Sequence, residues 1–327
     1  MNGTRLDNDS NPIGSQEDIA DEMARSKAYF YQMTTLVKAL VLLFFVAASA
    51  VTLVGNGLVI IIIAKIRRLQ IPANITIVNL ACYDFMIGLA LIATFDDHKP
   101  LFRCVSFTVY VVTLLYGNML GIGLSTINRY VAIVHPLRYN QLMTVKRTCI
   151  LMGLCFLYAL AWGIAAGIDM TYSWSPLSVC IVDIALSSGF VAVLVSHYII
   201  LFIIMTYCYT IIARIAWDHT VRMAAATAAE REEFSTFDAI MKKSKIILTV
   251  VGTSFILLVS HIMHMALSHI FPSSFKTLRI IRLIALIMNS LLNPIIYFFK
   301  YKDFRQATNE LFGCKPSSVV PFQPNMG

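Results

Sequence analysis

A small set of polar side chains lies deep inside long apolar stretches of this sequence. Asp84 stands in the stretch NLACYDF, and a carboxylate within a membrane-spanning helix carries a large energetic cost unless polar groups surround it. Amides and one hydroxyl stand in other apolar stretches, where they could act as its hydrogen-bond partners. They are Asn56, Asn118, Asn289, Ser290 and Asn293. We therefore predict a buried polar cluster around Asp84.

Arg129 raises the same problem at the end of another apolar run, Val109–Ile127. An arginine at the end of a membrane-length helix cannot lie in lipid without a large cost. It must face protein, a water-filled cavity or the aqueous edge. Tyr130 follows directly, and Pro136 and Leu137 follow after a short apolar strip. We predict that Arg129 points into a cleft at one mouth of the helix assembly.

The composition indicates that most of the chain lies in a membrane. The 327 residues are 58% hydrophobic and only 13% charged, whereas about a quarter of the residues of a soluble domain are charged. The first 27 residues are polar and acidic and lack the apolar core of a signal peptide. We therefore expect the first apolar segment to direct its own insertion.

Seven apolar runs reach the roughly 20 residues that a spanning helix needs. They are Val37–Ile63, Ile75–Thr94, Leu101–Val134, Cys149–Ile168, Ile184–Ile215, Ile246–Ile270 and Leu278–Phe299. The predicted fold is an all-α membrane protein, a seven-transmembrane helix bundle with an amphipathic eighth helix on the cytoplasmic face. Residues 1–36 form an extracellular tail, 37–299 the bundle, 300–313 the eighth helix and 314–327 a cytoplasmic tail.

The distribution of basic residues sets the predicted orientation. With the N-terminus outside, most of the 26 lysines and arginines lie on the inner side, as membrane proteins prefer. The net charge of +8 is then a cytoplasmic excess that contacts anionic lipid, and we expect no nucleic-acid partner. Asn2 and Asn8 begin glycosylation sequons on the outer tail.

Four of the seven cysteines can be interpreted from their positions alone. Cys82, Cys155 and Cys208 lie inside apolar runs and are predicted to be small core residues. Cys314 follows the amphipathic stretch Tyr301–Phe312, which is typical of a helix lying on the membrane surface. This thiol is either a site of S-acylation or an unmodified cysteine.

Several motifs occur in order from the first run to the tail, and together they resemble a known family. They are Gly55-Asn56, Leu80–Asp84, Cys104, Asn128-Arg129-Tyr130 with Pro136-Leu137, and Asn293–Tyr297. The chain resembles the rhodopsin-like (class A) G-protein-coupled receptors, with a faint similarity to the melanocortin, adenosine and cannabinoid group. The resemblance implies a plasma-membrane receptor and not an enzyme. It would have a ligand cavity outside and a heterotrimeric G-protein cavity inside.

The resemblance also implies roles for individual residues. Arg129, Tyr130, Pro136, Leu137 and Tyr297 would couple to the G protein. A sodium and water pocket would be formed by Asp84, Asn118, Asn289, Ser290 and Asn293, with Na⁺ as an allosteric ion. The alternative is a structural polar cluster without an ion. A disulfide bond would join Cys104 to Cys180.

The sequence departs from the family pattern at sites that control signalling. Asn128 replaces the acid that normally pairs with the arginine, so we predict raised basal signalling. The sixth run lacks the family's tryptophan and proline, and Leu258, Val259 and His261 stand there. A straighter sixth helix must switch differently or less.

The ligand is constrained by comparison with the family. Val111 stands where amine receptors carry aspartate, and Ile287 stands where opsins carry lysine, so we expect neither a biogenic amine nor retinal. Candidate pocket residues are Val111, Asp183, His264 and Arg279. Arg279 would attract an anion or snorkel to lipid headgroups, Asp183 would suit a basic peptide, and His264 would sense pH, bind a metal or line the pocket.

Three other functions remain as alternatives. A receptor-like protein with weak coupling that acts as a dimer partner is compatible with the missing sixth-helix residues. A secondary transporter would show paired repeats and broken helices, and neither is visible. A membrane enzyme would show clustered metal ligands or a nucleophile beside a base, and none stands out.

Overall fold

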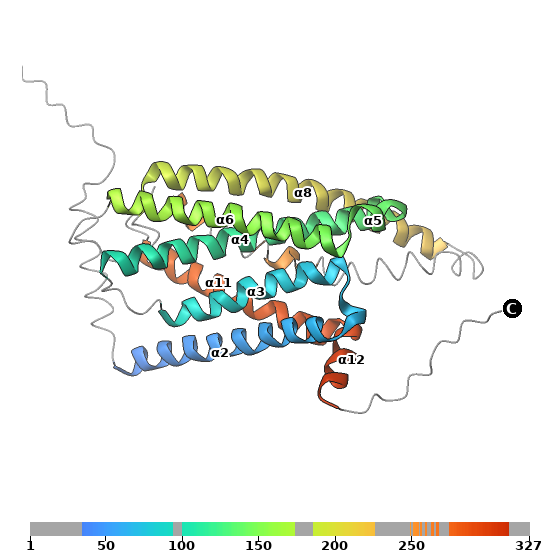
Figure 1. Cartoon of the computed structure of the whole chain (residues 1–327), viewed down its shortest axis with the longest axis horizontal. Coiled ribbons are helices and arrows are strands. Elements are labelled where there is room, and N and C mark those ends of the chain that lie inside the picture. The colour runs from blue at the N-terminus through green and yellow to red at the C-terminus, as the bar shows by residue number, and fades with distance from the viewer. Residues whose placement is uncertain are drawn as a thin grey trace, which may run out of the picture.

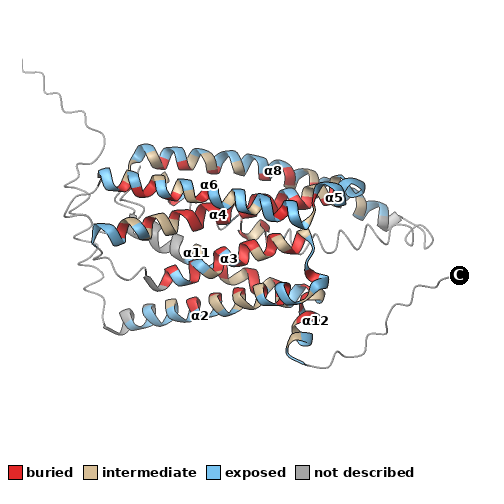
Figure 2. Ribbon diagram, in the orientation of Figure 1, coloured by how far each residue is buried: buried red, intermediate tan, exposed pale blue. Residues whose placement is uncertain are grey.

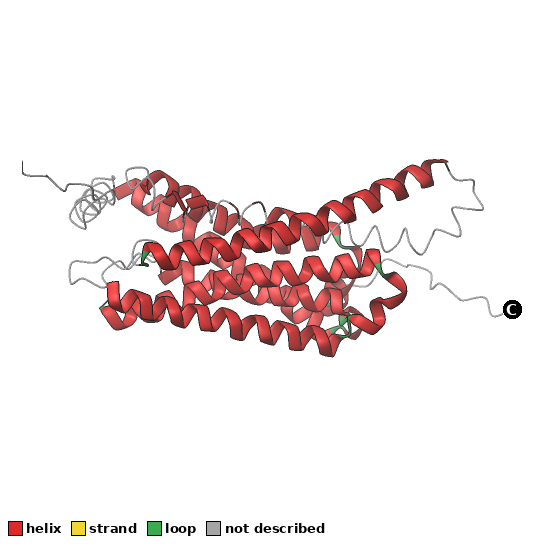
Figure 3. Ribbon diagram, turned by 90° about the horizontal axis from the view of Figure 1, so that it is seen from above, coloured by secondary structure: helices red, strands yellow, loops and turns green. Residues whose placement is uncertain are grey.

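The computed structural model describes residues 35–93, 100–173, 186–225 and 275–313, together with isolated positions between 249 and 267. Within this part of the chain all regular structure is helical (Figure 3). The helices are α2 (Thr35–Lys65), a short 3₁₀ turn η1 (Arg67–Leu69), α3 (Pro72–Ala93), α4 (Leu101–Val134), α5 (Pro136–Leu142), α6 (Val145–Ser173), α8 (Ser188–Ala225), α11 (Phe275–Lys300) and α12 (Lys302–Leu311).

The long helices run side by side, and α4 lies at the centre of the assembly (Figure 1). It packs against α3, α6 and α8, while α11 closes the other side against α2 and α3. The short helices α5 and α12 both lie at the end of the bundle where α4 finishes, which we call the Arg129 end. The opposite end, where α4 begins, is called the Cys104 end.

The outer surface of the bundle is apolar. Figure 2 shows long exposed faces on α6 and α8, which carry residues such as Leu157, Ile164, Ile199 and Ile203. Five of the described helices are long and apolar enough to span a membrane, and α11 joined to α12 across an 88° bend is a sixth candidate. Exposed apolar faces of this length are suited to lipid and not to water.

Six of the seven predicted spans correspond to described helices, although several of their bounds differ. Leu101–Val134 coincides with α4. The predicted span Cys149–Ile168 is shorter than the helix, since α6 runs from Val145 to Ser173. Helix α8 extends ten residues beyond the predicted end at Ile215. The backbone hydrogen bonds of a helix continue where the apolar residues stop, so hydrophobicity alone does not mark its ends. The predicted span Ile246–Ile270 lies mostly outside the described residues.

The predicted core cysteines are only partly in the core. Cys208 is buried and Cys155 is half-buried, but Cys82 is exposed, so the prediction is wrong for this residue. A helix that is apolar on all sides gives no periodic signal that separates its inner face from its outer face. The orientation of Cys82 could therefore not be obtained from the hydrophobic pattern.

Small residues allow close approach of the central helices. A Cβ atom added to Gly163 of α6 would collide with Thr113 Oγ1 and would lie 2.7 Å from the backbone oxygen of Val109 on α4. Gly55 of α2 faces Pro294 of α11 in the same way, with 2.9 Å to the proline Cγ. Such contacts are typical of membrane helix interfaces, where backbones pack directly.

Candidate functional site

The carboxylate of Asp84 lies at the centre of a buried polar cluster between α3, α4 and α11. Asn118 Nδ2 and Ser290 Oγ donate to its Oδ1 at 3.0 and 2.9 Å, and Asn293 Nδ2 donates to its Oδ2 at 2.7 Å. Asp84 itself is fully buried. The predicted convergence of these polar residues is therefore present, and each hydrogen bond joins a different position of the sequence to one carboxylate.

A second layer of polar groups holds these partners in place. Ser254 donates to Asn293 Oδ1 at 3.1 Å, so the segment 251–254 also reaches the cluster. Asn56 Nδ2 donates to the backbone oxygen of Ser290 at 3.1 Å and to that of Thr52 at 2.9 Å. The cluster thus links α2, α3, α4 and α11 through side chains that lipid could not solvate.

The cluster contains oxygen atoms suited to a hard monovalent cation. The carboxylate of Asp84 has three neutral donors and no basic partner among the described residues, which leaves its buried negative charge uncompensated. Asn289 precedes Ser290 on α11 and is buried, and its Oδ1 accepts no hydrogen bond from the described residues. Carboxylate, amide and hydroxyl oxygens are the ligands that hard cations prefer. The residues present therefore fit Na⁺.

Arg129 lies near the end of α4 and is only 6% exposed. Its Nε and Nη2 atoms make no hydrogen bond to the described residues. Tyr139, Tyr297 and Tyr301 lie close enough to interact with its charge, but none of these is an anion at neutral pH. Burial of a guanidinium with no acidic partner among the described residues carries a desolvation cost, which an acidic group at this site would reduce.

Asn128, the residue before Arg129, is hydrogen-bonded to a different helix. Tyr139 of α5 donates its hydroxyl to Asn128 Oδ1 at 2.9 Å. Burial raises the pKa of Tyr139, although the charge of Arg129 opposes this shift, so the hydroxyl stays protonated and can donate. This bond fixes α5 against α4 directly beside the arginine.

Tyr297 lies between the two polar centres. It is almost fully buried on α11, interacts electrostatically with both Asp84 and Arg129, and its hydroxyl has no hydrogen-bond partner among the described residues. Pro294, three residues earlier, lies inside α11 and removes one backbone donor from the helix. A single movement of this part of α11 would therefore change the surroundings of both charged residues.

The other residues of the predicted coupling surface lie at the Arg129 end. Pro136 begins α5, and Leu137 next to it is 95% exposed, while Tyr130 is half-buried and packs near Ile133 and Ile212. These positions are not joined to the Asp84 cluster by any hydrogen bond among the described residues. They form the rim of the region in which Arg129 is the buried centre.

The predicted ligand-pocket residues are only partly described. Val111 packs against a buried apolar cluster near the Cys104 end, and His264 is buried. The cluster consists of Tyr83, Ile87, Leu114 and Leu115. Arg279 belongs to α11, but its side chain lies outside the described set, as do Asp183, Cys180, Cys314, Asn2 and Asn8 in full. Cys104 is buried and disulfide-bonded, with a partner outside the described residues.

Two functional contacts were missed from the sequence. Asp169 at the end of α6 accepts hydrogen bonds from the backbone nitrogen and the hydroxyl of Ser187 at 2.7 and 2.6 Å, and so fixes the start of α8. Tyr139 was missed as the partner of Asn128. The signal for Ser187 was its position before a helix, where serine is a favoured cap, but nothing in the sequence indicated the distant carboxylate.

Comparison with known proteins supplies independent information. Residues 55–297 match the 7 transmembrane receptor (rhodopsin family). The chain is 26% identical to the histamine H2 receptor of Canis lupus familiaris over 82% of this chain and 78% of that protein. It is 25% identical to G-protein coupled receptor 3 of Mus musculus over 82% of this chain and 81% of that protein. A shorter match, 33% identical, joins 37% of this chain to 35% of the trace amine-associated receptor 365 of Petromyzon marinus.

Proposed function

This chain belongs to the rhodopsin family of seven-transmembrane receptors, and from that premise we propose a receptor with raised basal activity toward heterotrimeric G proteins. Family membership makes the chain a multi-pass plasma-membrane receptor that acts through G proteins, and it agrees with the predicted seven-helix bundle. Members of this family are generally not enzymes. The raised basal activity and the nature of the ligand are the parts that we propose.

One observation carries the proposal of basal activity. Arg129 is buried without an acidic partner among the described residues. The position that would supply one carries the amide Asn128, whose Oδ1 accepts a hydrogen bond from Tyr139. An ion pair at this position would stabilise the inactive arrangement by about 0–1 kcal/mol if exposed, and by more if buried. Without it, the inactive state loses that stabilisation, and a larger fraction of receptors adopts the active state before any ligand binds.

The proposed G-protein surface is the Arg129 end of the bundle. Arg129 would meet the inserted segment of the G protein, and Leu137 would contact its body because it projects almost fully exposed from α5. Tyr130 and Pro136 form the rest of this surface, and Tyr297 would carry the change from the Asp84 cluster. This assignment places the Arg129 end in the cytoplasm and the N-terminus outside.

The proposed allosteric ion is Na⁺ at Asp84. The support is the uncompensated carboxylate with its oxygen-bearing neighbours, Asn118, Asn289, Ser290 and Asn293. A bound cation would supply positive charge to the cluster. The residues of the chain would hold the carboxylate oriented and keep lipid away from it.

The proposed ligand is an extracellular molecule other than a biogenic amine or retinal, although two relatives are named for histamine and trace amines. The support is Val111, which offers no carboxylate and packs against the apolar cluster that contains Tyr83 and Leu115. Asp169 is a described carboxylate at the Cys104 end, but it already accepts two hydrogen bonds from Ser187. It is therefore not free to pair with the ammonium group of an amine. A disulfide bond from Cys104 to Cys180, glycans on Asn2 and Asn8 and a lipid on Cys314 complete the proposed extracellular and membrane features.

The function is tested in cells that express the chain or its Arg129→Ala variant at matched surface levels. Second-messenger output is measured without ligand and with a panel of chimeric G proteins, and then with small-molecule and peptide libraries. The proposal expects basal output from the unmodified chain that Arg129→Ala lacks. Equal output from both would contradict it and would favour a receptor-like dimer partner that couples weakly.

A further inference from the structure

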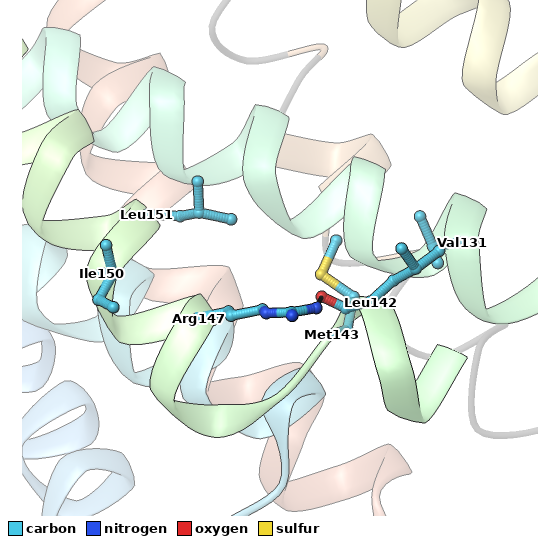
Figure 4. Close-up of a pocket in the computed structure, with 6 residues that line it drawn as sticks. All are labelled: Val131, Leu142, Met143, Arg147, Ile150 and Leu151. Atoms are coloured by element: carbon cyan, nitrogen blue, oxygen red, sulfur yellow. Dashed lines mark hydrogen bonds between the residues drawn. The ribbon is translucent and has the colours of Figure 1, made fainter. Parts of the chain in front are cut away.

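An open cavity of about 370 Å³ lies at the Arg129 end, between the last turn of α4, the end of α5 and the first turns of α6 (Figure 4). This volume falls at the lower end of the range for ligand sites, roughly 300–1,000 Å³. Five of the six residues that line it are apolar and one is an arginine. They are Val131, Leu142, Met143, Arg147, Ile150 and Leu151.

The cavity lies where two helices enter the membrane. Val131 is three residues from the end of the candidate span Leu101–Val134, and Arg147 and Ile150 belong to the first turns of the candidate span Val145–Tyr172. The side chains of Ile150 and Leu151 are exposed, so no described part of the chain covers them. At this level an occupant has its apolar portion in the hydrocarbon layer and its polar portion in the headgroup layer.

Arg147 gives this cavity one positive charge with unused donors. Its Nη1 donates to the backbone oxygens of Gln141 and Leu142, and in Figure 4 the side chain extends from α6 toward Leu142. Its Nε and Nη2 make no hydrogen bond to the described residues, and no acidic side chain pairs with it there. A guanidinium carries five donors in a planar fork that matches phosphate, so this residue can retain α5 and bind an anion together.

We propose that this cavity binds an anionic phospholipid, with an acyl chain against Ile150 and Leu151 and the headgroup phosphate on Arg147. A sterol has no phosphate for Arg147, a zwitterionic phospholipid brings a second cation beside it, and a soluble anion would leave the apolar wall uncovered. Lys146 and Arg138 are exposed nearby and add to the attraction for anionic lipid. The occupant is therefore a lipid with an acyl chain for the apolar wall and an anionic headgroup for Arg147.

The site is coupled to the centre of the receptor through α5. Arg147 holds the carbonyls at the end of α5, and Tyr139 of the same short helix donates to Asn128 beside Arg129. A phosphate on Arg147 would bind next to this helix and change how firmly it is held. Lipid binding stands independently of the proposed function, whereas its effect on signalling rests on that function.

The test uses the full-length chain reconstituted in vesicles of equal parts phosphatidylcholine and phosphatidylserine, and mass spectrometry of the lipids retained after mild solubilisation. The unmodified chain should retain phosphatidylserine over phosphatidylcholine. Arg147→Gln should lower this preference about fivefold, because it removes a direct hydrogen-bonded contact to the headgroup that contributes about 1 kcal/mol. Its matched control, Lys146→Gln, removes an adjacent charge that does not line the cavity and should lower the preference much less than Arg147→Gln does.

A second pair of variants tests the apolar part of the site while Arg147 stays intact. Ile150→Trp fills the cavity and should lower retention of phosphatidylserine, whereas Leu154→Trp, one turn further along α6 and equally exposed to lipid, should not. Thermal unfolding midpoints near that of the unmodified chain show that the variants fold. Added inorganic phosphate should not displace the lipid, because it has no acyl chain.

Three results would overturn the proposal. One is an unmodified chain without preference for phosphatidylserine. Another is an equal loss in Lys146→Gln and Arg147→Gln, which would indicate diffuse attraction by surface charge. The third is unchanged lipid retention in Ile150→Trp, and if G-protein activation then slows in this variant, the cavity belongs to a protein partner. None of the lipid measurements requires G-protein coupling, so their failure is separate from a failure of the proposed function.

Discussion

Tyr139 donates a hydrogen bond of 2.9 Å to Asn128 Oδ1 and thereby joins α5 to α4 beside Arg129. Asn128 stands where related receptors carry an acid that pairs with the arginine. Here its amide oxygen instead accepts a hydrogen bond from the Tyr139 hydroxyl on the short helix α5. The arginine stays buried with two nitrogen atoms unpartnered among the described residues. Under the proposed function, the balance between inactive and active states would then depend on contacts weaker than an ion pair.

The first prediction concerns the attachment of α5. Tyr139→Phe removes the hydroxyl and should weaken the docking of Pro136–Leu142 by about 1 kcal/mol, the typical net contribution of one such bond. Hydrogen exchange of the α5 amides should become about fivefold faster. Tyr172→Phe, at a site 87% exposed, serves as the control and should change nothing. Unaltered exchange in Tyr139→Phe would show that the bond does not hold α5.

The second prediction concerns the cation at Asp84. The thermal midpoint of the purified chain should be higher in sodium chloride than in N-methylglucamine chloride, because a ligand at ten times its Kd stabilises by about 1.4 kcal/mol. Asp84→Asn should abolish this difference. In sodium-free buffer it should be at least as stable as the unmodified chain, since it removes an uncompensated buried charge.

Asp218→Asn is the matched control for this experiment. It removes an exposed carboxylate on α8 and should keep the full response to sodium. A sodium effect that survives in Asp84→Asn, or one that is absent from the unmodified chain, would mean that the cluster is purely structural.

The third prediction concerns the close contact between α4 and α6. Gly163→Ala forces a Cβ against Thr113 and the backbone oxygen of Val109, and the backbone cannot rotate away as a side chain would. We expect a loss of about 1–3 kcal/mol, measured as a lower thermal midpoint. Gly153→Ala on the same helix meets nothing within 4 Å and should be neutral or slightly stabilising. Equal effects of the two substitutions would exclude close packing at Gly163.

The fourth prediction concerns the attachment of α12. Phe304 is fully buried and its ring lies 6.1 Å from that of Tyr297 and 5.6 Å from that of Phe298. Phe304→Ala should weaken the docking of α12 by about 3–5 kcal/mol and make its amides exchange as in a free peptide. Phe312→Ala, at a site 61% exposed, should leave their protection intact. Protected amides in Phe304→Ala would mean that the ion pair Arg68–Glu310 or lipid holds this helix instead.

The polar residues within the apolar runs allowed the buried cluster around Asp84 to be predicted from the sequence. A carboxylate in a spanning helix must find partners, so Asp84, Asn118, Ser290 and Asn293 could be predicted to meet without knowledge of the packing. The limits of α4 could be predicted because polar or proline residues flank its apolar run at both ends. The ends of α4 follow from local sequence features. The partners of Asp84 follow because few polar residues occur in the other apolar runs.

Packing details could not be predicted in the same way. Cys82 was expected in the core but is exposed, because an apolar helix in lipid has no sequence contrast between its faces. The bonds from Tyr139 to Asn128 and from Ser187 to Asp169 join elements whose approach depends on the whole bundle. The cavity at Arg147 depends in the same way on how α4, α5 and α6 diverge.

The most direct test of the account measures agonist-free nucleotide exchange on a purified heterotrimeric G protein by the full-length chain in lipid nanodiscs. Asn128→Asp restores an acid beside Arg129 and should slow exchange about fivefold for each 1 kcal/mol of ion pairing gained. Arg129→Ala should reduce exchange to the receptor-free rate while keeping the sodium-dependent thermal midpoint that shows a folded bundle. Exchange by the unmodified chain that exceeds both variants is the predicted result, and exchange no faster than that of Arg129→Ala would contradict the account.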